Sequence, residues 1–191
     1  MLFYYLQPFY STKMINDFPR LETERLILDK ITVEDIPQIV LYLQDKVFSD
    51  YTSNIPYPYR KEDAEFWLKL STENFKNRKG FTFAIREKKG KLLGAIGLQD
   101  EGSDKAELGY WIGVPNWNNG YVTEAAKAVI DYGFSKLNFN KIFATYFPHN
   151  PASGKVLSKI GMKKEAVLKQ HLKKDGKYYD IPMYSIFKND R

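Results

Sequence analysis

Two hydrophobic periods alternate along the chain, and the changes between them predict where helices and strands lie. Apolar residues recur at helical spacing in residues 32–44, 61–78, 121–137 and 151–160. Alternating or β-branched apolar residues predict strands at residues 21–31, 81–86, 91–98, 105–114, 141–147, 164–172 and 177–187. Residues 50–60 contain prolines and show no period, so they are expected to form a loop.

Taken in order, these segments predict a mixed α/β (α+β) fold with the order β-α-α-β-β-β-α-β-α-β-β. Three antiparallel strands precede a strand–helix–strand crossover, so the central sheet is expected to be mostly antiparallel. Asp175-Gly176 predicts the turn of the last hairpin, and Pro182 predicts an edge or a bulge in the final strand. The sequence shows no repeat or linker, which predicts one domain over residues 14–191 and a peripheral extension over residues 1–13.

The composition narrows the chemistry. The 191 residues include no cysteine and 2 histidines, which excludes disulfides, a cysteine nucleophile and a cysteine-ligated metal, and argues against a histidine-rich metal site. The lack of cysteine is consistent with a reducing compartment, so a cytoplasmic location is expected. The net charge of +6 is compatible with nucleic acid, a membrane surface or a polyanionic small molecule as partner, and equally with a solvated lysine-rich surface.

The stretch from residue 106 to residue 124, AELGYWIGVPNWNNGYVTE, is the centre of the functional interpretation. An alternating strand runs into a polar turn with Gly120, and the turn runs into a helix whose first N–H groups are available to an anion. We expect this turn to hold the pyrophosphate of a nucleotide cofactor. It matches neither GxGxxG nor GxxxxGK[ST], which argues against dinucleotide-binding and kinase interpretations. The alternative is a strand–helix turn closed by asparagine caps.

Four spaced motifs extend this interpretation. They are LETERLIL from residue 21, GYWIGVPNWNNGYVTEAAKAVIDYGF from residue 109, NPASGKVLSKIGMKKE from residue 150 and DGKYYDIPMYSIF from residue 175. Together they resemble the GNAT acetyltransferase superfamily, in particular its RimJ/RimL-type branch. The resemblance spans residues 21–187 and implies a GNAT-like fold with a sheet splayed at the cofactor site by a bulge in the strand at residues 108–114. It also implies acetyl-CoA as co-substrate, no metal, and a primary amine as acceptor.

The resemblance assigns the cofactor contacts residue by residue. Backbone groups of the splayed strand would bind the pantetheine arm, from Tyr110, Trp111 and Ile112. The turn and the helix start would cradle the pyrophosphate, through Asn118, Asn119, Gly120, Tyr121, Val122 and Thr123. Asn150 would bond the arm and Ser153 would lie near the sulfur, although Asn150 by itself has the position of a helix N-cap. Val122 stands where the superfamily has a small residue, and Asn119 where the branch often has lysine.

The expected reaction is the attack of a neutral amine on a thioester carbonyl, which needs a base because free amines are mostly protonated at pH 7. Glu107 is the candidate base, and an ordered water is the alternative. Ser153 is the candidate proton donor to the departing thiolate, with Tyr146 and Tyr179 as alternatives. The backbone N–H of Ile112 is the candidate for binding the oxyanion. An acetyl-cysteine intermediate is impossible without cysteine, which favours direct transfer in a ternary complex.

The acceptor is expected to be a protein N-terminus, as the RimJ/RimL resemblance suggests, or a small amine such as an antibiotic or a polyamine. Its channel would be lined by Tyr51, Tyr57, Tyr59, Tyr178, Tyr179 and Asp180. A non-catalytic acyl-CoA-binding module is the alternative function. No nucleic-acid partner is expected, because the lysines are scattered and the aromatic residues follow strand periods. No membrane partner is expected either, because the apolar start of the chain is too short to span a bilayer, and the protein is expected to be a monomer or homodimer.

Overall fold

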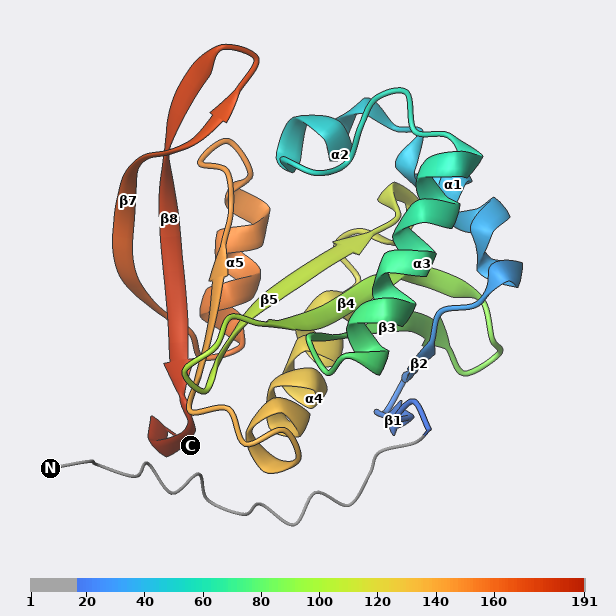
Figure 1. Ribbon diagram of the computed structural model, residues 1–191, viewed down its shortest axis with the longest axis horizontal. Coiled ribbons are helices and arrows are strands. Elements are labelled where there is room, and N and C mark those ends of the chain that lie inside the picture. The colour runs from blue at the N-terminus through green and yellow to red at the C-terminus, as the bar shows by residue number, and fades with distance from the viewer. Residues whose placement is uncertain (1–16, 191) are drawn as a thin grey trace, which may run out of the picture.

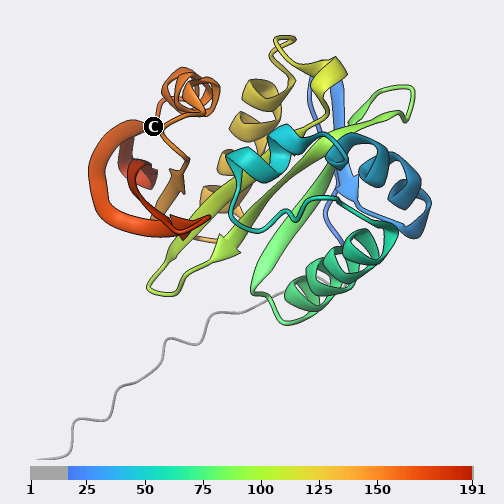
Figure 2. The same cartoon turned by 90° about the horizontal axis from the view of Figure 1, so that it is seen from above.

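The computed structural model describes residues 17–190, so the extension predicted at residues 1–13 lies outside the described part of the chain. An eight-stranded sheet in the order β1-β2-β3-β4-β5-β6-β8-β7 carries helices on both of its faces (Figures 1 and 2). This architecture confirms the predicted mixed α/β fold. Within residues 17–190, no helix combines the length and the apolar character that crossing a membrane requires.

The N-terminal half contributes two short strands and the helices of one face. Its elements are β1 Leu21–Glu22, β2 Leu26–Lys30, a 3-10 turn at Val33–Asp35, α1 Ile36–Leu43, α2 Lys46–Tyr51 and α3 Lys61–Lys76. The prediction of one strand over residues 21–31 is wrong, because the Thr23 amide donates to the Leu26 carbonyl at 3.0 Å and turns the chain back on itself. The first two residues of the loop predicted at residues 50–60 belong instead to helix α2. This helix begins after Asp45, whose carboxylate caps it by accepting from the Val47 amide at 3.0 Å.

The C-terminal half follows the predicted order. Its elements are β3 Gly80–Glu87, β4 Leu92–Asp100, β5 Lys105–Ile112, a 3-10 turn at Val114–Asn116, α4 Tyr121–Ser135, β6 Lys141–Thr145, α5 Pro151–Lys159, β7 Lys163–Lys174, β8 Lys177–Phe187 and a final 3-10 turn at Lys188–Asp190. Asp175 and Gly176 both have positive φ, 48° and 79°, as the predicted hairpin turn requires. The edge predicted from Pro182 is wrong, because β8 lies between β6 and β7, and the register irregularities fall in β7 instead.

The sheet opens between β5 and β6. These strands run parallel, but they pair only from Lys105 with Lys141 to Glu107 with Phe143. In Figure 1, β5 leans away from the nearly vertical β7–β8 pair beside β6. The predicted bulge in β5 is wrong, since its pairing with β4 runs without a shift as far as Ile112. The opening needs no bulge. Strand β4 stays paired with β5 as far as Ile112, whereas β6 pairs with β5 only as far as Glu107 and ends at Thr145.

Two hydrophobic cores hold the helices against the sheet, one on each face. The core of α4 and α5 includes Leu98, Leu108, Ile130 and Leu157, and the core of α1 and α3 includes Ile39, Leu43, Ala64 and Ala95. Tyr110 packs against the first core and Trp111 against the second, as the alternation of side chains along a strand requires. Strand β5 therefore presents functional groups to both faces.

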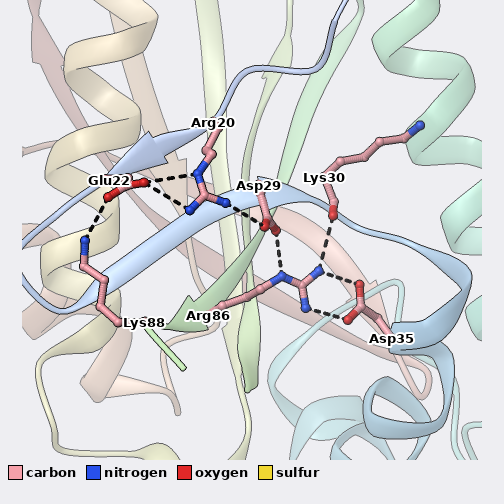
Figure 3. Close-up of polar contacts among 7 residues, drawn as sticks. All are labelled: Arg20, Glu22, Asp29, Lys30, Asp35, Arg86 and Lys88. Atoms are coloured by element: carbon pink, nitrogen blue, oxygen red, sulfur yellow. Dashed lines mark hydrogen bonds and ion pairs between the residues drawn. The ribbon is translucent and has the colours of Figure 1, made fainter. Parts of the chain in front are cut away.

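An ion-pair network fixes the start of α1 to the sheet (Figure 3). The Arg86 guanidinium binds Asp29 through Nε at 2.7 Å and Asp35 through Nη1 at 2.6 Å. The side chains of Arg86 and Asp35 are only 13% and 8% exposed. Burial by itself would raise the pKa of Asp35, but the hydrogen bonds from Arg86 and from the Thr32 amide outweigh it and hold that pKa below its usual value. The network therefore contains a largely buried ion pair, Arg86 with Asp35, which anchors the start of α1 to the sheet.

Candidate functional site

Within residues 17–190, no neighbouring strand pairs the backbone groups along the open edge of β5, although the Ile112 carbonyl accepts a hydrogen bond from the Trp117 indole. Lys105, the first residue of this strand, and Gly113, the residue after its end, both direct backbone groups toward β4 and the turn that follows β4. Because direction alternates along a strand, the intervening even-numbered residues direct theirs away from β4. Beyond the section paired with β6, these are Leu108, Tyr110 and Ile112. This edge matches the position expected for an extended ligand that binds through amides and carbonyls.

The turn after β5 is held by close packing against α1. A Cβ atom on Gly113 would lie 2.6 Å from a ring carbon of Tyr42, so no other residue fits there without displacing the ring. The buried Asn116 side chain donates to the Tyr42 hydroxyl and to the Leu93 carbonyl, both at 3.3 Å. The Trp117 indole donates to the Ile112 carbonyl at 2.8 Å. These contacts position the end of the open strand relative to the helix that follows.

The start of α4 has the features of an anion site. Gly120 is the N-cap with φ of 76°, and Asn118 also has positive φ, 61°. Among residues 17–190, nothing accepts a hydrogen bond from the amides of the first three helical residues, Tyr121, Val122 and Thr123. The Asn119 side chain instead donates to the Trp117 carbonyl at 3.0 Å. The alternative of a turn closed by asparagine caps is therefore wrong.

Tyr110 and Ser153 meet across the opening. The Tyr110 hydroxyl lies 2.7 Å from the Ser153 hydroxyl, which links β5 to the first turn of α5. Burial raises the pKa of Tyr110 to about 12, although the Ser153 hydrogen bond acts in the opposite direction. Asn150 is the predicted N-cap, since its side-chain oxygen accepts from the Ser153 amide at 3.3 Å. Tyr146 packs on the same helix, where a Cβ on Gly154 would lie 2.5 Å from its hydroxyl.

Glu107 lies on the opposite face of the sheet, as the alternation predicts. Its carboxylate accepts from the Thr145 hydroxyl at 2.9 Å. Burial raises the pKa of Glu107, and the hydrogen bond from Thr145 opposes that rise. The neighbouring Gly109 points the same way, is exposed, and has no atom within 4 Å of the place where a Cβ would lie. Open space therefore lies next to the Glu107 carboxylate, at Gly109, on the face of the sheet that α1 and α3 cover.

Helix α2 and the β7–β8 hairpin meet on this side of the molecule. The Lys174 ammonium donates to the carbonyls of Ser49 and Thr52 at the end of α2, the second at 2.8 Å. An imidazole nitrogen of His149 lies 2.9 Å from the Asp50 carbonyl. The His149 ring also contacts Tyr51 and Tyr179, with centroids 5.8 and 5.6 Å apart. Two of the predicted acceptor residues are thus brought to one histidine.

The other predicted acceptor residues lie elsewhere. Tyr57 is 54% exposed, and the ring contacts of His149 within residues 17–190 are to other residues, Tyr51, Phe147 and Tyr179. The prediction for Tyr59 is wrong, because this residue is 5% exposed and belongs to the core of α1 and α3. Tyr178 is 60% exposed and lies under the Lys173 ammonium. Asp180 accepts from the Lys169 ammonium and the Gln170 amide at 2.7 and 2.9 Å, which gives it a structural role in β7.

Sequence reasoning missed several residues that hold the site together. Arg25 donates to the Asn119 carbonyl at 3.0 Å, and its guanidinium lies 4.9 Å from the centre of the Tyr121 ring. The others are Tyr42, Asn116, Thr145, His149 and Lys174. The hydrogen-bond partners of their side chains lie 23 to 125 positions away in the chain, so no local pattern points to them.

Comparison with known proteins supports the resemblance drawn from the motifs. Residues 25–163 match the family model described as the acetyltransferase (GNAT) domain. An uncharacterized N-acetyltransferase, YoaA of Bacillus subtilis, is 35% identical over 175 residues, which cover 90% of this chain and 98% of that protein. A GNAT-family acetyltransferase from Bacillus anthracis has the same fold, with a TM-score of 0.80, 25% identity, and coverage of 90% and 99% of the two chains.

A third neighbour carries a ligand. It is RimL, a ribosomal L7/L12 α-N-protein acetyltransferase in complex with coenzyme A, with a TM-score of 0.81 at 14% identity and coverage of 88% of this chain and 98% of that one. At this identity the likeness concerns the fold alone. The family match covers most of the described sheet, including the open strand β5 and the uncapped start of α4. The chain therefore belongs to the GNAT acetyltransferase family and is an acetyltransferase of the N-acetyltransferase type.

Proposed function

We propose that the protein transfers an acetyl group from acetyl-CoA to a primary amine by direct attack in a ternary complex. The observation that carries this proposal is the open edge of β5, which ends at a helix start whose amides have no partner within residues 17–190. An extended arm with a pyrophosphate at one end has the donors and acceptors to satisfy both features. The coenzyme A bound to RimL supports the choice of this ligand.

We also propose which groups contact the cofactor. The backbone of Tyr110 and Ile112 would bind the pantetheine arm, and Trp111 would support it from the opposite face through the core of α1 and α3. The amides that follow Gly120 would bind the pyrophosphate. Val122 is buried, so its side chain packs into the core and leaves its amide on the ligand side. Asn150 keeps its role as N-cap, and we propose that it orients Ser153 as well.

The reaction needs two proton transfers, and the two faces of β5 supply one group each. The amine nitrogen attacks the thioester carbonyl carbon, the amine proton passes to Glu107, and the C–S bond breaks as the thiolate takes a proton from Ser153. Solvent then returns a proton to the Ser153 oxygen and removes the one held by Glu107, which restores both groups. The raised pKa makes the Glu107 carboxylate a stronger base than an ordinary glutamate. The Ile112 amide faces the opening, and we propose that it binds the oxyanion.

We propose a peptide N-terminus as the acceptor. The acceptor side carries a cationic hairpin, with Lys169, Lys173, Lys174 and Lys177. Like charges disfavour a polyamine, which carries several positive charges, more than a peptide with a single α-amino group. RimL, an α-N-protein acetyltransferase with the same fold, agrees with this choice. Small amines remain the second candidate because Gly109 leaves open space beside Glu107.

The release of free thiol from acetyl-CoA tests the proposal. The panel contains short peptides with free N-termini, the same peptides with blocked N-termini, and spermidine. We expect thiol release with free N-termini only. Release with spermidine alone would overturn the peptide assignment, and a rise in melting temperature with acetyl-CoA but no thiol release from any amine would indicate a binding module. If acetyl-CoA gives neither signal, the cofactor assignment is wrong.

A further inference from the structure

The loop at the cofactor end of β5 has no cation of its own. Between Lys105 and Lys127 the sequence contains no lysine or arginine, so the first turn of α4 and the turn before it contribute only neutral side chains and one acid. That acid is Glu124, which lies in the first turn of α4. A carboxylate there opposes a phosphate ligand, because both are negative and lie at the same helix terminus.

Glu124 is charged. Burial by itself would raise its pKa, but hydrogen bonds from Thr23 and Arg25 outweigh that and lower the pKa below the usual value. The Thr23 hydroxyl and the Arg25 amide donate to one carboxylate oxygen at 2.5 and 2.9 Å. The side chain is 18% exposed, so water screens the charge only in part. The negative charge is therefore a fixed feature of the helix start.

Arg25, which lies 99 positions earlier in the chain, provides the positive charge that compensates Glu124. Its Nε donates to the second oxygen of Glu124 at 2.7 Å, and its Nη1 donates to the Asn119 carbonyl at 3.0 Å. Nη2 lies 3.5 Å from the place where a Cβ on Gly120 would be, and this residue is the N-cap. The Arg25 side chain is 45% exposed, so it stays accessible beside the helix start.

We propose that Arg25 is a positioning residue for the cofactor: it cancels the charge of Glu124 and holds the Asn119 carbonyl, which makes the start of α4 receptive to the pyrophosphate. This inference rests on the proposed use of acetyl-CoA. Without Arg25, the helix start would carry an uncompensated carboxylate, and the affinity for a pyrophosphate would fall. The affinity for the pantetheine part would stay the same, because that part binds along β5.

The test measures the dissociation constants of coenzyme A and of S-acetylpantetheine, which lacks the pyrophosphate, by calorimetry. We expect Arg25→Met to weaken coenzyme A binding about tenfold, and the effect to shrink as salt rises from about 0.05 to 0.5 M, because the missing interaction is electrostatic. Binding of S-acetylpantetheine should stay within about twofold. Arg20→Met is the matched control. Arg20 is also an exposed arginine, and it pairs with Glu22 of the edge strand β1.

The double variant Arg25→Met/Glu124→Gln separates charge from folding. It removes both charges, so we expect coenzyme A affinity to return to within about threefold of the wild-type value. Unchanged affinity in Arg25→Met, equal loss for both probes, or no recovery in the double variant would each overturn the inference while the proposed function stands. A wild-type protein that binds neither probe would overturn the proposed function, and this inference with it.

Discussion

The Tyr110 hydroxyl lies 2.7 Å from the Ser153 hydroxyl and joins β5 to α5 across the opening of the sheet. With a pKa raised to about 12, Tyr110 keeps its proton at neutral pH and can act as the donor in this pair. The Ser153 hydroxyl then accepts from Tyr110 and keeps its own proton free. That proton is the one proposed for the departing thiolate, so the tyrosine sets the direction of the serine hydroxyl.

Ser153→Ala should lower turnover at least about tenfold, because general acids contribute factors of about 100 or more when they act in the rate-limiting step. The KM for acetyl-CoA should change less than about threefold. Ser158→Ala is the matched control on the same helix, since the Ser158 hydroxyl donates to the Gly154 carbonyl at 3.0 Å. Steady-state kinetics with one peptide acceptor checks this, and equal turnover in the two variants would rule out the proton-donor role.

Glu107→Gln should lower the rate at pH 7 more than at pH 9. At pH 9 a larger share of the amine is already neutral, so the base contributes less. The measurement is the pH profile of the rate at saturating acetyl-CoA for the wild type and the variant. An equal loss at both pH values would argue against a base and in favour of a role in binding.

The same substitution has a predicted effect on stability. Burial raises the pKa of Glu107 in the folded state, so the folded protein holds more protons than the unfolded chain between the usual glutamate pKa and the raised one. Stability attributable to this group therefore falls as pH rises through that window. Glu107→Gln should match or exceed the melting temperature of the wild type at pH 7, and the difference should vanish near pH 4. A lower melting temperature at pH 7 would contradict this.

Gly94→Ala should be strongly destabilising. A methyl group at this position would collide with the Trp111 carbonyl and lie 2.7 Å from the Ile112 Cα, and backbone atoms of a paired strand cannot move aside cheaply. We expect a loss of about 2–4 kcal/mol in the free energy of unfolding. Gly109→Ala is the control on β5, where a Cβ meets nothing within 4 Å, and it should change stability by less than about 1 kcal/mol. Urea unfolding of both variants measures the difference.

Arg86→Met should cost about 3–5 kcal/mol, because it leaves the carboxylates of Asp29 and Asp35 without their shared cation. The exposed pair of Lys88 and Glu22 provides the control, and Lys88→Met should cost less than about 1 kcal/mol. The pKa of Asp35 is lowered, so its contribution is present above the usual aspartate pKa and is lost as pH falls through the lowered value. The difference in the free energy of unfolding between wild type and Asp35→Asn should therefore narrow in acid. A difference that does not change with pH would contradict the assignment of a charged Asp35 carboxylate to this network.

The order of helices and strands was predictable because it depends on local patterns, namely the spacing of apolar residues and short turn motifs. The periods of apolar residues placed α3, α4, α5 and the strands of the meander, and Asn150-Pro151 and Asp175-Gly176 marked a helix start and a hairpin turn. The motifs placed the chain in its family. The break at Thr23 and the short helix α2 were missed because each depends on a single side-chain or backbone hydrogen bond rather than on a period.

The arrangement of the candidate site was decided by tertiary structure alone. Arg25 reaches Glu124 across 99 positions, Tyr110 reaches Ser153 across 43, and Lys174 reaches the end of α2 across more than 100. Contacts of this kind form only after the sheet has brought distant segments together, so no spacing in the sequence encodes them. The sequence determined which chemical groups are available, and packing of the two cores against β5 decided which of them face the same opening.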